Sequence, residues 1–329
     1  MSGRSGPALH GWLVLDKPRS LGSTQAVGFV KRILREGGYA KVKVGHGGTL
    51  DPLAEGVLPI ALGEATKLAG RMLDASKTYD FTIRFGEQTD TLDTEGEVVT
   101  TSDCRPSRAE IEAIVPHFTG RIEQAPPAFS AIKVDGKRAY ALARAGEEVT
   151  MNRRAVTIAS IDIVVPAHEL PVDHGRGASI PEPNRMRDVT LRAHVSKGTY
   201  IRSLARDIAQ ALGTVGHVTY LRRIKAGPFT ETRAISLDLA EQSAKGGHLE
   251  NLLLPLEAGL DDIPVLPLDP DSAQAVRRGR VLSDLPPVQG EWRDGLHLAM
   301  LGSTPVALME LDSGTAKVVR GFNLPDVAE

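Results

Sequence analysis

GHGGTLDPLAEGVLP, residues 45–59, combines a glycine-rich turn, one carboxylate and an apolar flank. Glycine allows positive φ and close backbone approach, so the turn can fold tightly against another segment or a ligand. Pro52 fixes its own φ and biases Asp51 towards an extended conformation, which limits where that carboxylate points. The leucine and valine side chains on either side should be buried. A carboxylate held beside apolar surface is how enzymes build a nucleophile or a general base.

The residues alone leave other interpretations of this stretch open. Asp before Pro is common in turns and at helix N-caps, and a glycine-rich loop can simply turn the chain. A Walker-type phosphate loop is excluded, because the Gly-Lys-Ser/Thr ending is missing. A glycoside hydrolase would need a second positioned acid, and Glu55, inside the same apolar turn, is a poor candidate.

Composition indicates a globular protein of 329 residues, 41% of them hydrophobic, long enough for one large domain and a small one. No apolar run is long enough to cross a bilayer and no secretory leader is visible, so no membrane contact is expected. Cys104 is the only cysteine, which fits a reducing cytosol, and a cytoplasmic protein is expected. The nine histidines show no paired metal-ligand spacing, and no metal is expected.

The net charge is −2, but the charges are unevenly distributed. Residues 1–50 and 191–225 each carry an excess of six positive charges, whereas residues 51–130 carry an excess of seven negative ones. Two basic segments can present one positive face, and such a face attracts a phosphate backbone. Either segment alone is better explained as a solvated surface. Together, flanking Asp51, they favour an RNA partner.

Periodicity predicts an α+β fold. Apolar residues recur with helical period in residues 26–34 and 201–212, whereas residues 79–85 and 189–195 alternate as strands. Because regular βαβ spacing is missing, we expect a large mixed, mostly antiparallel sheet flanked by helices, with a cleft across its centre. Ser107-Arg108-Ala109-Glu110 is a capping box that opens a further helix.

Two polar segments are expected to be loops. The acids of residues 87–97 fit a solvated turn, with a metal-binding loop as a weaker interpretation. Residues 166–186 are rich in proline, glycine and charge, which is typical of a mobile surface loop between two strands.

Three side chains lie where elements begin, and they can reach a cleft. Tyr79 begins an alternating strand. Tyr200 and Arg202 lie where a strand turns into a helix through Lys197-Gly198, and Arg206, one turn later, could share the side of Arg202.

Five separated motifs resemble the TruB-type tRNA pseudouridine synthases, especially the bacterial ones. In chain order they are GHGGTLDPLAEGVLPIALGEATK (45–67), KTY (77–79) with FGEQTDTLDTEG (85–96), PAFSAIK (127–133), SKGTYIR (196–202) and YLRR (220–223). The match covers most of residues 10–240, and five motifs in one order rarely coincide by chance. A sixth, more N-terminal stretch that begins with Lys17-Pro18 departs from the family pattern. Ser20 replaces a glycine and Gly22 replaces a hydroxyl residue, which predicts a rearranged turn.

The resemblance implies a reaction. The chain would isomerise uridine 55 in the T loop of tRNA to pseudouridine, binding the T-arm stem-loop without cofactor, metal or guide RNA. Asp51 would be the catalytic carboxylate, and Arg202 would pair with it and orient it. Tyr79 would stack on the flipped-out uracil and could help to remove the C5 proton.

Further substrate-binding side chains implied by the resemblance are His46, Tyr200, Leu221, Lys17 and Lys67. Tyr200 and Leu221 would form apolar walls, and His46 would fill the vacated space or hold a neighbouring base. Lys17 would lie beside the site. Lys67 and the basic residues of 222–225 could contact phosphates, although surface salt bridges are equally consistent with them.

The alternative function is a non-catalytic tRNA-binding or folding factor that uses the same surface. A pure binder does not need Asp51, Tyr79 and Arg202 together, which favours catalysis. A guide-RNA-dependent relative is not expected, because the chain has no long basic tail. A monomer is expected.

Two domains are expected: a catalytic pseudouridine synthase domain over residues 1–258 and a small domain over residues 259–329. Asp261-Asp262-Ile263-Pro264 is typical of a linker. The last 65 residues suggest a short helix (273–278) followed by small strands, similar to the PUA-like C-terminal domain of the family.

Overall fold

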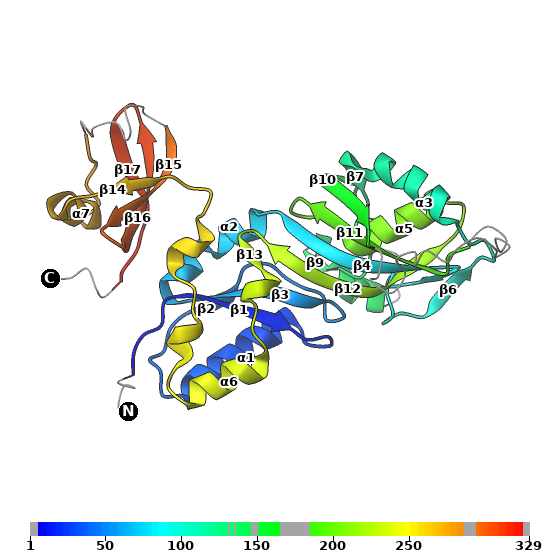
Figure 1. The fold of residues 1–329 in the computed structure, drawn as a ribbon, viewed down its shortest axis with the longest axis horizontal. Coiled ribbons are helices and arrows are strands. Elements are labelled where there is room, and N and C mark those ends of the chain that lie inside the picture. Colours follow the sequence, from blue (N-terminus) through cyan, green and yellow to red (C-terminus); the bar gives the residue numbers. More distant parts are fainter. Residues whose placement is uncertain are drawn as a thin grey trace, which may run out of the picture.

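The computed structural model describes residues 6–130, 132–134, 136–145, 151–164, 185–283, 285 and 294–324. It shows a large body built on a nine-stranded sheet and a small body built on a four-stranded one (Figure 1). The predicted α+β class with a large mixed sheet is confirmed. Most of the loop predicted at 166–186 lies outside the described residues.

The main path of the large sheet runs in the order β1-β3-β12-β4-β11-β10-β7, with β2 paired to β3 and β13 paired to β12. The β12–β3 pair is parallel and its neighbours on this path are antiparallel. The strands are β1 (Gly11–Lys17), β2 (Val44–His46), β3 (Glu55–Leu62), β4 (Lys77–Phe85), β7 (Gly120–Gln124), β10 (Arg154–Ile163), β11 (Asp188–Val195), β12 (Gly216–Ala226) and β13 (Phe229–Thr230).

The strand β4 shows why the sequence alternates. Phe81, Ile83 and Phe85 are buried on one face, whereas Asp80 and Arg84 lie on the other. There they pair with charges of β11, Asp80 with Arg192 at 2.7 Å and Arg84 with Asp188 at 2.8 Å. The predicted alternation of both strands is confirmed.

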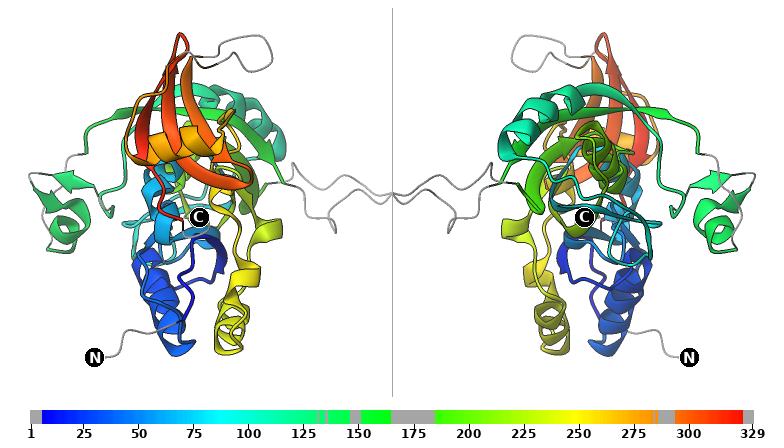
Figure 2. Two further views of the ribbon diagram at one scale, coloured as in Figure 1. Left: turned by 90° about the vertical axis from the view of Figure 1, so that its left-hand side faces the viewer. Right: turned by 90° about the vertical axis from the view of Figure 1, so that its right-hand side faces the viewer.

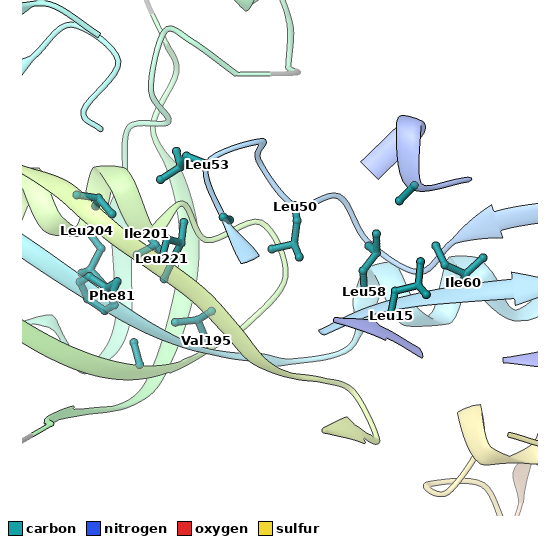
Figure 3. Close-up of a cluster of buried hydrophobic side chains, with 14 of the residues drawn as sticks. Leu15, Leu50, Leu53, Leu58, Ile60, Phe81, Val195, Ile201, Leu204 and Leu221 are labelled. Atoms are coloured by element: carbon teal, nitrogen blue, oxygen red, sulfur yellow. The ribbon is translucent and has the colours of Figure 1, made fainter. Parts of the chain in front are cut away.

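Helices cover the apolar face. The predicted stripe of α5 (Ile201–Ala211) is confirmed, because Leu204, Ala205 and Ile208 are fully buried. At the other end, α1 (Ser23–Glu36) and α6 (Leu237–Lys245) lie side by side (Figures 1 and 2). One apolar cluster runs between these two ends along the sheet (Figure 3).

Shorter elements connect this framework. The capping box of α3 is present, with the Ser107 N–H donating to Glu110 Oε2 at 2.6 Å. The bounds are α2 (Ala69–Asp74), α3 (Arg108–Ile114), α4 (Ala139–Arg144), η1 (Gly63–Leu68), η2 (Val115–Phe118), η4 (Glu231–Arg233), η5 (Leu249–Leu252), η6 (Leu256–Gly259), β5 (Glu87–Thr89), β6 (Val98–Thr101), β8 (Lys133–Val134) and β9 (Lys137–Arg138).

The small body contains β14 (Val265–Pro267), β15 (Gly295–Leu301), β16 (Thr304–Asp312) and β17 (Thr315–Gly321), with α7 (Pro270–Arg277) packed on them. The predicted short helix is confirmed and begins three residues early, because Asp269 caps it and Pro270 occupies its first position. The PUA-like character and the boundary at residue 258 stay predictions. Among the described residues, no helix is long and apolar enough to cross a membrane.

Candidate active site

A pocket of about 290 Å³ lies where the loop 48–54 meets β4, β12 and the start of α5. Its volume is at the lower end of the range for small-molecule sites, roughly 300–1,000 Å³. Five of the eight predicted site residues line it: Asp51, Tyr79, Arg202, Tyr200 and Leu221. His46, Lys17 and Lys67 do not line it.

The carboxylate of Asp51 and the guanidinium of Arg202 form an ion pair. Arg202 Nη2 lies 2.8 Å from Asp51 Oδ2, and the side chains are 6% and 34% exposed respectively. Arg202 reaches the loop because it lies in the first turn of α5, just after the N-cap residue Tyr200. The expected pairing is therefore present, with the acid open to the pocket and the arginine beneath it.

A second carboxylate, from Asp93, holds Arg202 from the other side. Arg202 Nη1 donates to Asp93 Oδ2 at 3.0 Å and to the Thr91 carbonyl at 2.9 Å, and Asp93 is only 1% exposed. The solvated turn predicted for residues 87–97 is therefore wrong for Asp93. The spacing of acids could not distinguish it, because its burial depends on an arginine more than a hundred residues later. The buried Leu92 just before it is the local signal.

These charges affect Glu95 in the same turn. Burial, and then the nearby Asp93, raise the pKa of Glu95, whereas Arg202 opposes that shift. The turn thus places its acids in two environments, with Asp93 buried and paired to a guanidinium and Glu95 on the exposed side of the same turn.

The loop that carries Asp51 is held by the start of α1. The Ser23 hydroxyl donates to the Leu50 carbonyl at 3.0 Å and accepts from the Leu50 N–H at 2.8 Å. The Ser20 N–H donates to the Pro52 carbonyl at 2.7 Å. Ser20 has φ +70°, so a serine occupies a conformation that favours glycine, the residue that the family pattern has there; the rearranged turn stays a prediction. Leu50 and Leu53 then anchor the loop in the core (Figure 3).

Two basic residues of β12, predicted as phosphate contacts, are used within the protein. Arg223 is 1% exposed and donates to the carbonyls of Val57, Thr49 and Gly48 at 2.8, 3.3 and 3.2 Å. That prediction is wrong for Arg223, which instead fixes the turn 48–49. Arg222 pairs with Asp16 at 3.0 Å and Glu55 at 3.4 Å, so the salt-bridge alternative holds there.

Two buried lysines support the pocket. Lys17 is fully buried and donates to the carbonyls of Leu21, Pro18 and Pro52 at 2.7, 2.9 and 3.4 Å. Lys77, which the sequence analysis missed, donates to those of Ala75, Leu73 and Met72 at 2.6–2.9 Å. Burial, and then Arg223, lower the pKa of each amine to about 8. Lys17 therefore lies beside the site, as expected, but positions the backbone under Asp51.

His46 and Lys67 lie outside the pocket. His46, in β2, is half-buried, and burial followed by Arg223 lowers its pKa. Lys67 pairs with Glu64 at 2.6 Å and donates to the Gly321 carbonyl at 2.9 Å, so its amine is used within the protein.

Aromatic rings complete the walls. The Tyr79 hydroxyl has no hydrogen-bond partner within the described residues and is available to a ligand. The ring of Tyr200 lies 4.9 Å from the guanidinium carbon of Arg154. The fully buried Gln124 exchanges hydrogen bonds with the Tyr200 backbone at 2.8 and 3.1 Å, which fixes the start of α5. Sequence analysis missed Arg154 and Gln124, neither of which has a local signal.

The pocket thus offers one oriented carboxylate, a stacking ring with a free hydroxyl, and apolar walls. That combination suits nucleophilic or general-base chemistry on a flat heterocycle. No cluster of His, Cys, Asp and Glu suited to a metal ion occurs in the described part of the chain.

Two family models match the chain. The model for the TruB family pseudouridylate synthase N-terminal domain matches residues 31–201, and that for the tRNA pseudouridylate synthase B C-terminal domain matches residues 202–261. A tRNA pseudouridine synthase B from Novosphingobium aromaticivorans is 60% identical, covering 98% of this chain and all of the relative. One from Zymomonas mobilis is 52% identical over 96% and 97% of the two chains.

Comparison with solved structures finds chains with a similar fold. A chain of a Cbf5–Nop10–Gar1 complex superposes with a TM-score of 0.65 at 26% identity, covering 96% of this chain and 86% of that one. A chain of an H/ACA ribonucleoprotein bound to a substrate RNA containing 2′-deoxyuridine gives 0.67 at 24% identity, covering 97% and 86%. At the latter identity the likeness shows the fold alone.

Proposed function

The chain belongs to the TruB family of pseudouridylate synthases, and from this premise we propose that it isomerises uridine 55 in the T loop of tRNA, with Asp51 as the catalytic carboxylate. Its activity as a tRNA pseudouridine synthase follows from relatives of that name that match both chains over almost their full lengths. The position of the uridine and the role of Asp51 are the proposal. The observation that carries it is the Asp51–Arg202 pair at 2.8 Å inside a pocket with an aromatic wall.

The reaction needs one carboxylate. The N1–C1′ bond breaks, the uracil turns, and C1′ joins C5, while the C5 proton leaves and N1 gains a proton, so that no atoms are lost overall. Asp51 can begin this by attack at C1′ or at C6, or by removing the C2′ proton. Its open side faces the pocket, and Arg202 and the held loop fix its direction, which is what a near-attack geometry requires.

The size of the pocket supports recognition of a single nucleoside. Because a uridine stacked in a loop cannot present C1′ and C5 to a pocket of about 290 Å³, we propose that it flips out of the stack. Tyr79 then stacks on the uracil, and its free hydroxyl reaches the C5 proton late in the reaction. Tyr200 and Leu221 form the walls, and His46 fills the space that the base leaves.

We further propose that the chain acts as a monomer, without guide RNA, and that residues 1–258 form the catalytic domain. The alternative, a non-catalytic tRNA-binding factor, leaves the buried Arg202–Asp51 pair without a purpose, because binding alone would not need a desolvated guanidinium aimed at an open acid.

The test is to map pseudouridine in unmodified tRNA transcripts incubated with the purified protein or with Asp51→Asn. We expect modification at uridine 55 with the parent protein and none with the variant, while tRNA affinity stays the same, because the amide keeps the shape and loses the charge. Asp51→Glu should also fail, since it moves the carboxylate by about 1 Å, enough to cost roughly a hundredfold in rate. The exposed Asp103→Asn serves as the matched control. Activity in Asp51→Asn, or modification elsewhere, would contradict the proposal.

A further inference from the structure

Ion pairs neutralise most of one of the two basic segments. In residues 191–225, Arg192, Lys197 and Arg206 pair with carboxylates at 2.7–2.8 Å. Arg222 pairs with Asp16, and Arg202 and Arg223 are buried. Of the seven cations in this segment, only Lys225 is exposed without an ion-pair partner among the described residues, so the segment offers a weaker positive face than its charge balance predicts.

In residues 6–50, Lys17 and Arg32 are engaged within the protein, but four other cations are exposed and weakly paired or unpaired. Lys31, Lys41 and Lys43 are exposed and have no ion-pair partner among the described residues, and Arg35 approaches Glu36 only to 3.8 Å. These four side chains surround one groove of about 830 Å³, formed by α1, residues 39–45 and the η1–α2 segment. Its floor is apolar and includes the buried Leu34.

The groove adjoins the active pocket along two paths. Residues 41–45 line the groove, and residues 48–51, just after β2, line the pocket. Thr66 and Ala69 line the groove, whereas Leu73 lines the pocket. Ala69 and Leu73 are about one helical turn apart, roughly 6 Å along the helix axis, so the linings of the two cavities come close together on this segment. Either path would lead an RNA strand from the pocket into the groove.

We propose that this groove binds the phosphate backbone of the RNA next to the nucleotide held in the pocket, with Lys31, Arg35, Lys41 and Lys43 as its phosphate contacts. This inference rests on the proposed function for its substrate. Free cations matter, because a phosphate would have to displace the carboxylate from any cation already paired. The apolar floor suits the methylene stems of the lysines and the faces of the riboses. An acidic protein is the other occupant that such a groove could take.

The test compares two double variants with the same change in formal charge. Lys41→Ala/Lys43→Ala removes free cations at the groove. Arg84→Ala/Arg192→Ala removes paired cations from the opposite face of the sheet. Affinity for an unmodified tRNA transcript is measured between about 50 and 200 mM salt.

For the groove variant we expect the slope of log affinity against log salt to become shallower by roughly 1.4–1.8, since each lost phosphate contact contributes roughly 0.7–0.9. KM should rise more than kcat falls. The control variant should keep the parent slope and activity. A parent-like slope in the groove variant, or equal slopes in the two variants, overturns the proposal and leaves the groove to an acidic protein.

A second measurement locates the RNA. With Cys104→Ser as background, a cleavage reagent attached to Lys43→Cys should cut the strand beside the modified uridine, and cuts confined to distant regions overturn the proposal. The proposed function fails separately, if the parent forms no pseudouridine. If the parent forms pseudouridine and the groove variant binds tRNA as the parent does, the groove proposal is refuted and the proposed function stands.

Discussion

Arg202 determines the geometry of the site at the scale of single residues. Its guanidinium donates to Asp93 and to the carbonyls of Thr91 and Phe129 at 2.9–3.1 Å, and it forms an ion pair with Asp51 at 2.8 Å. Its Nε is buried without a partner in the described structure. These four partners in fixed positions hold the guanidinium in one orientation. That orientation in turn fixes the direction of the Asp51 carboxylate.

Asp93→Asn should therefore damage turnover without touching the substrate. The amide still accepts a hydrogen bond, but Arg202 is then balanced by one carboxylate and can turn towards Asp51. We expect the rate of pseudouridine formation to fall by roughly a hundredfold, the cost of about 1 Å of misplacement, with unchanged tRNA affinity. Thermal unfolding checks that the variant is folded, and Asp103→Asn is the control. Parent-like turnover would show that Asp93 does not position the arginine.

Lys77 should make stability depend on pH. Its pKa is about 8 in the folded protein and 10.5 ordinarily, so between those values the unfolded chain binds more protons. The free energy of unfolding therefore rises with pH across that window, and Lys77→Met abolishes this contribution. Urea unfolding from about pH 7 to about pH 10 should show the parent gaining stability relative to the variant as pH rises. Lys245→Met, an exposed control, should show no such change relative to the parent.

What the sequence could predict at this scale depended on motifs. Asp51, Tyr79, Tyr200 and Leu221 stand in stretches that resemble the family, and the structure brings them together. Arg223, Lys17 and Asp93 have roles set by burial and distant partners, which neither spacing nor charge counts contain.

At the scale of elements, the parallel pair β12–β3 connects the loop of Asp51 to the strand of Leu221. Alternation predicted β4 and β11, but it predicted neither β3 nor β12. Their pairing could not be predicted either, because register depends on contacts between residues 55–56 and 222–223. Gly56 makes this pairing possible. It has φ +98°, and a Cβ there would lie 2.3 Å from the Arg223 carbonyl oxygen.

Gly56→Ala should therefore be strongly destabilising, whereas Gly45→Ala should not. Backbone strain and the clash with Arg223 together should cost about 2–4 kcal/mol. Gly45 lies in the adjacent β2, and a Cβ there would meet nothing within 4 Å, so its replacement should stay within about 0.5 kcal/mol. Urea unfolding of both variants measures the difference, and equal stabilities would refute the steric argument.

At the scale of the whole molecule, the two bodies share an apolar cluster. Phe322, Leu298 and Leu308 from the small body join Trp12 and Val14 from β1. Lys67 and Glu64 hold the same junction, because they bond the Gly321 carbonyl and the Asn323 N–H. The sequence suggested a separate small domain. It did not show that this domain would help to bury one face of β1, while the apolar cluster of the large body buries the other face.

Phe322→Ala should thus lower the stability of the large body as well. Phe322 is 4% exposed, and its truncation should cost about 3–5 kcal/mol. The nearby Val319, 55% exposed, provides the control, with Val319→Ala within about 0.5 kcal/mol. Hydrogen exchange of β1 amides should accelerate in Phe322→Ala, and unchanged protection there would mean that the bodies unfold independently.

The distance along the chain between Asp51 and Arg202 determines when the site can form during protein synthesis. A ribosome adding roughly 5–20 residues per second completes Asp51 about 8–30 s before it delivers Arg202, and Asp93 about 5–22 s before. During that interval Asp93 has no guanidinium and stays hydrated, so its turn cannot close around it. An emerging chain therefore cannot form the Asp51–Arg202 pair until residue 202 has been added.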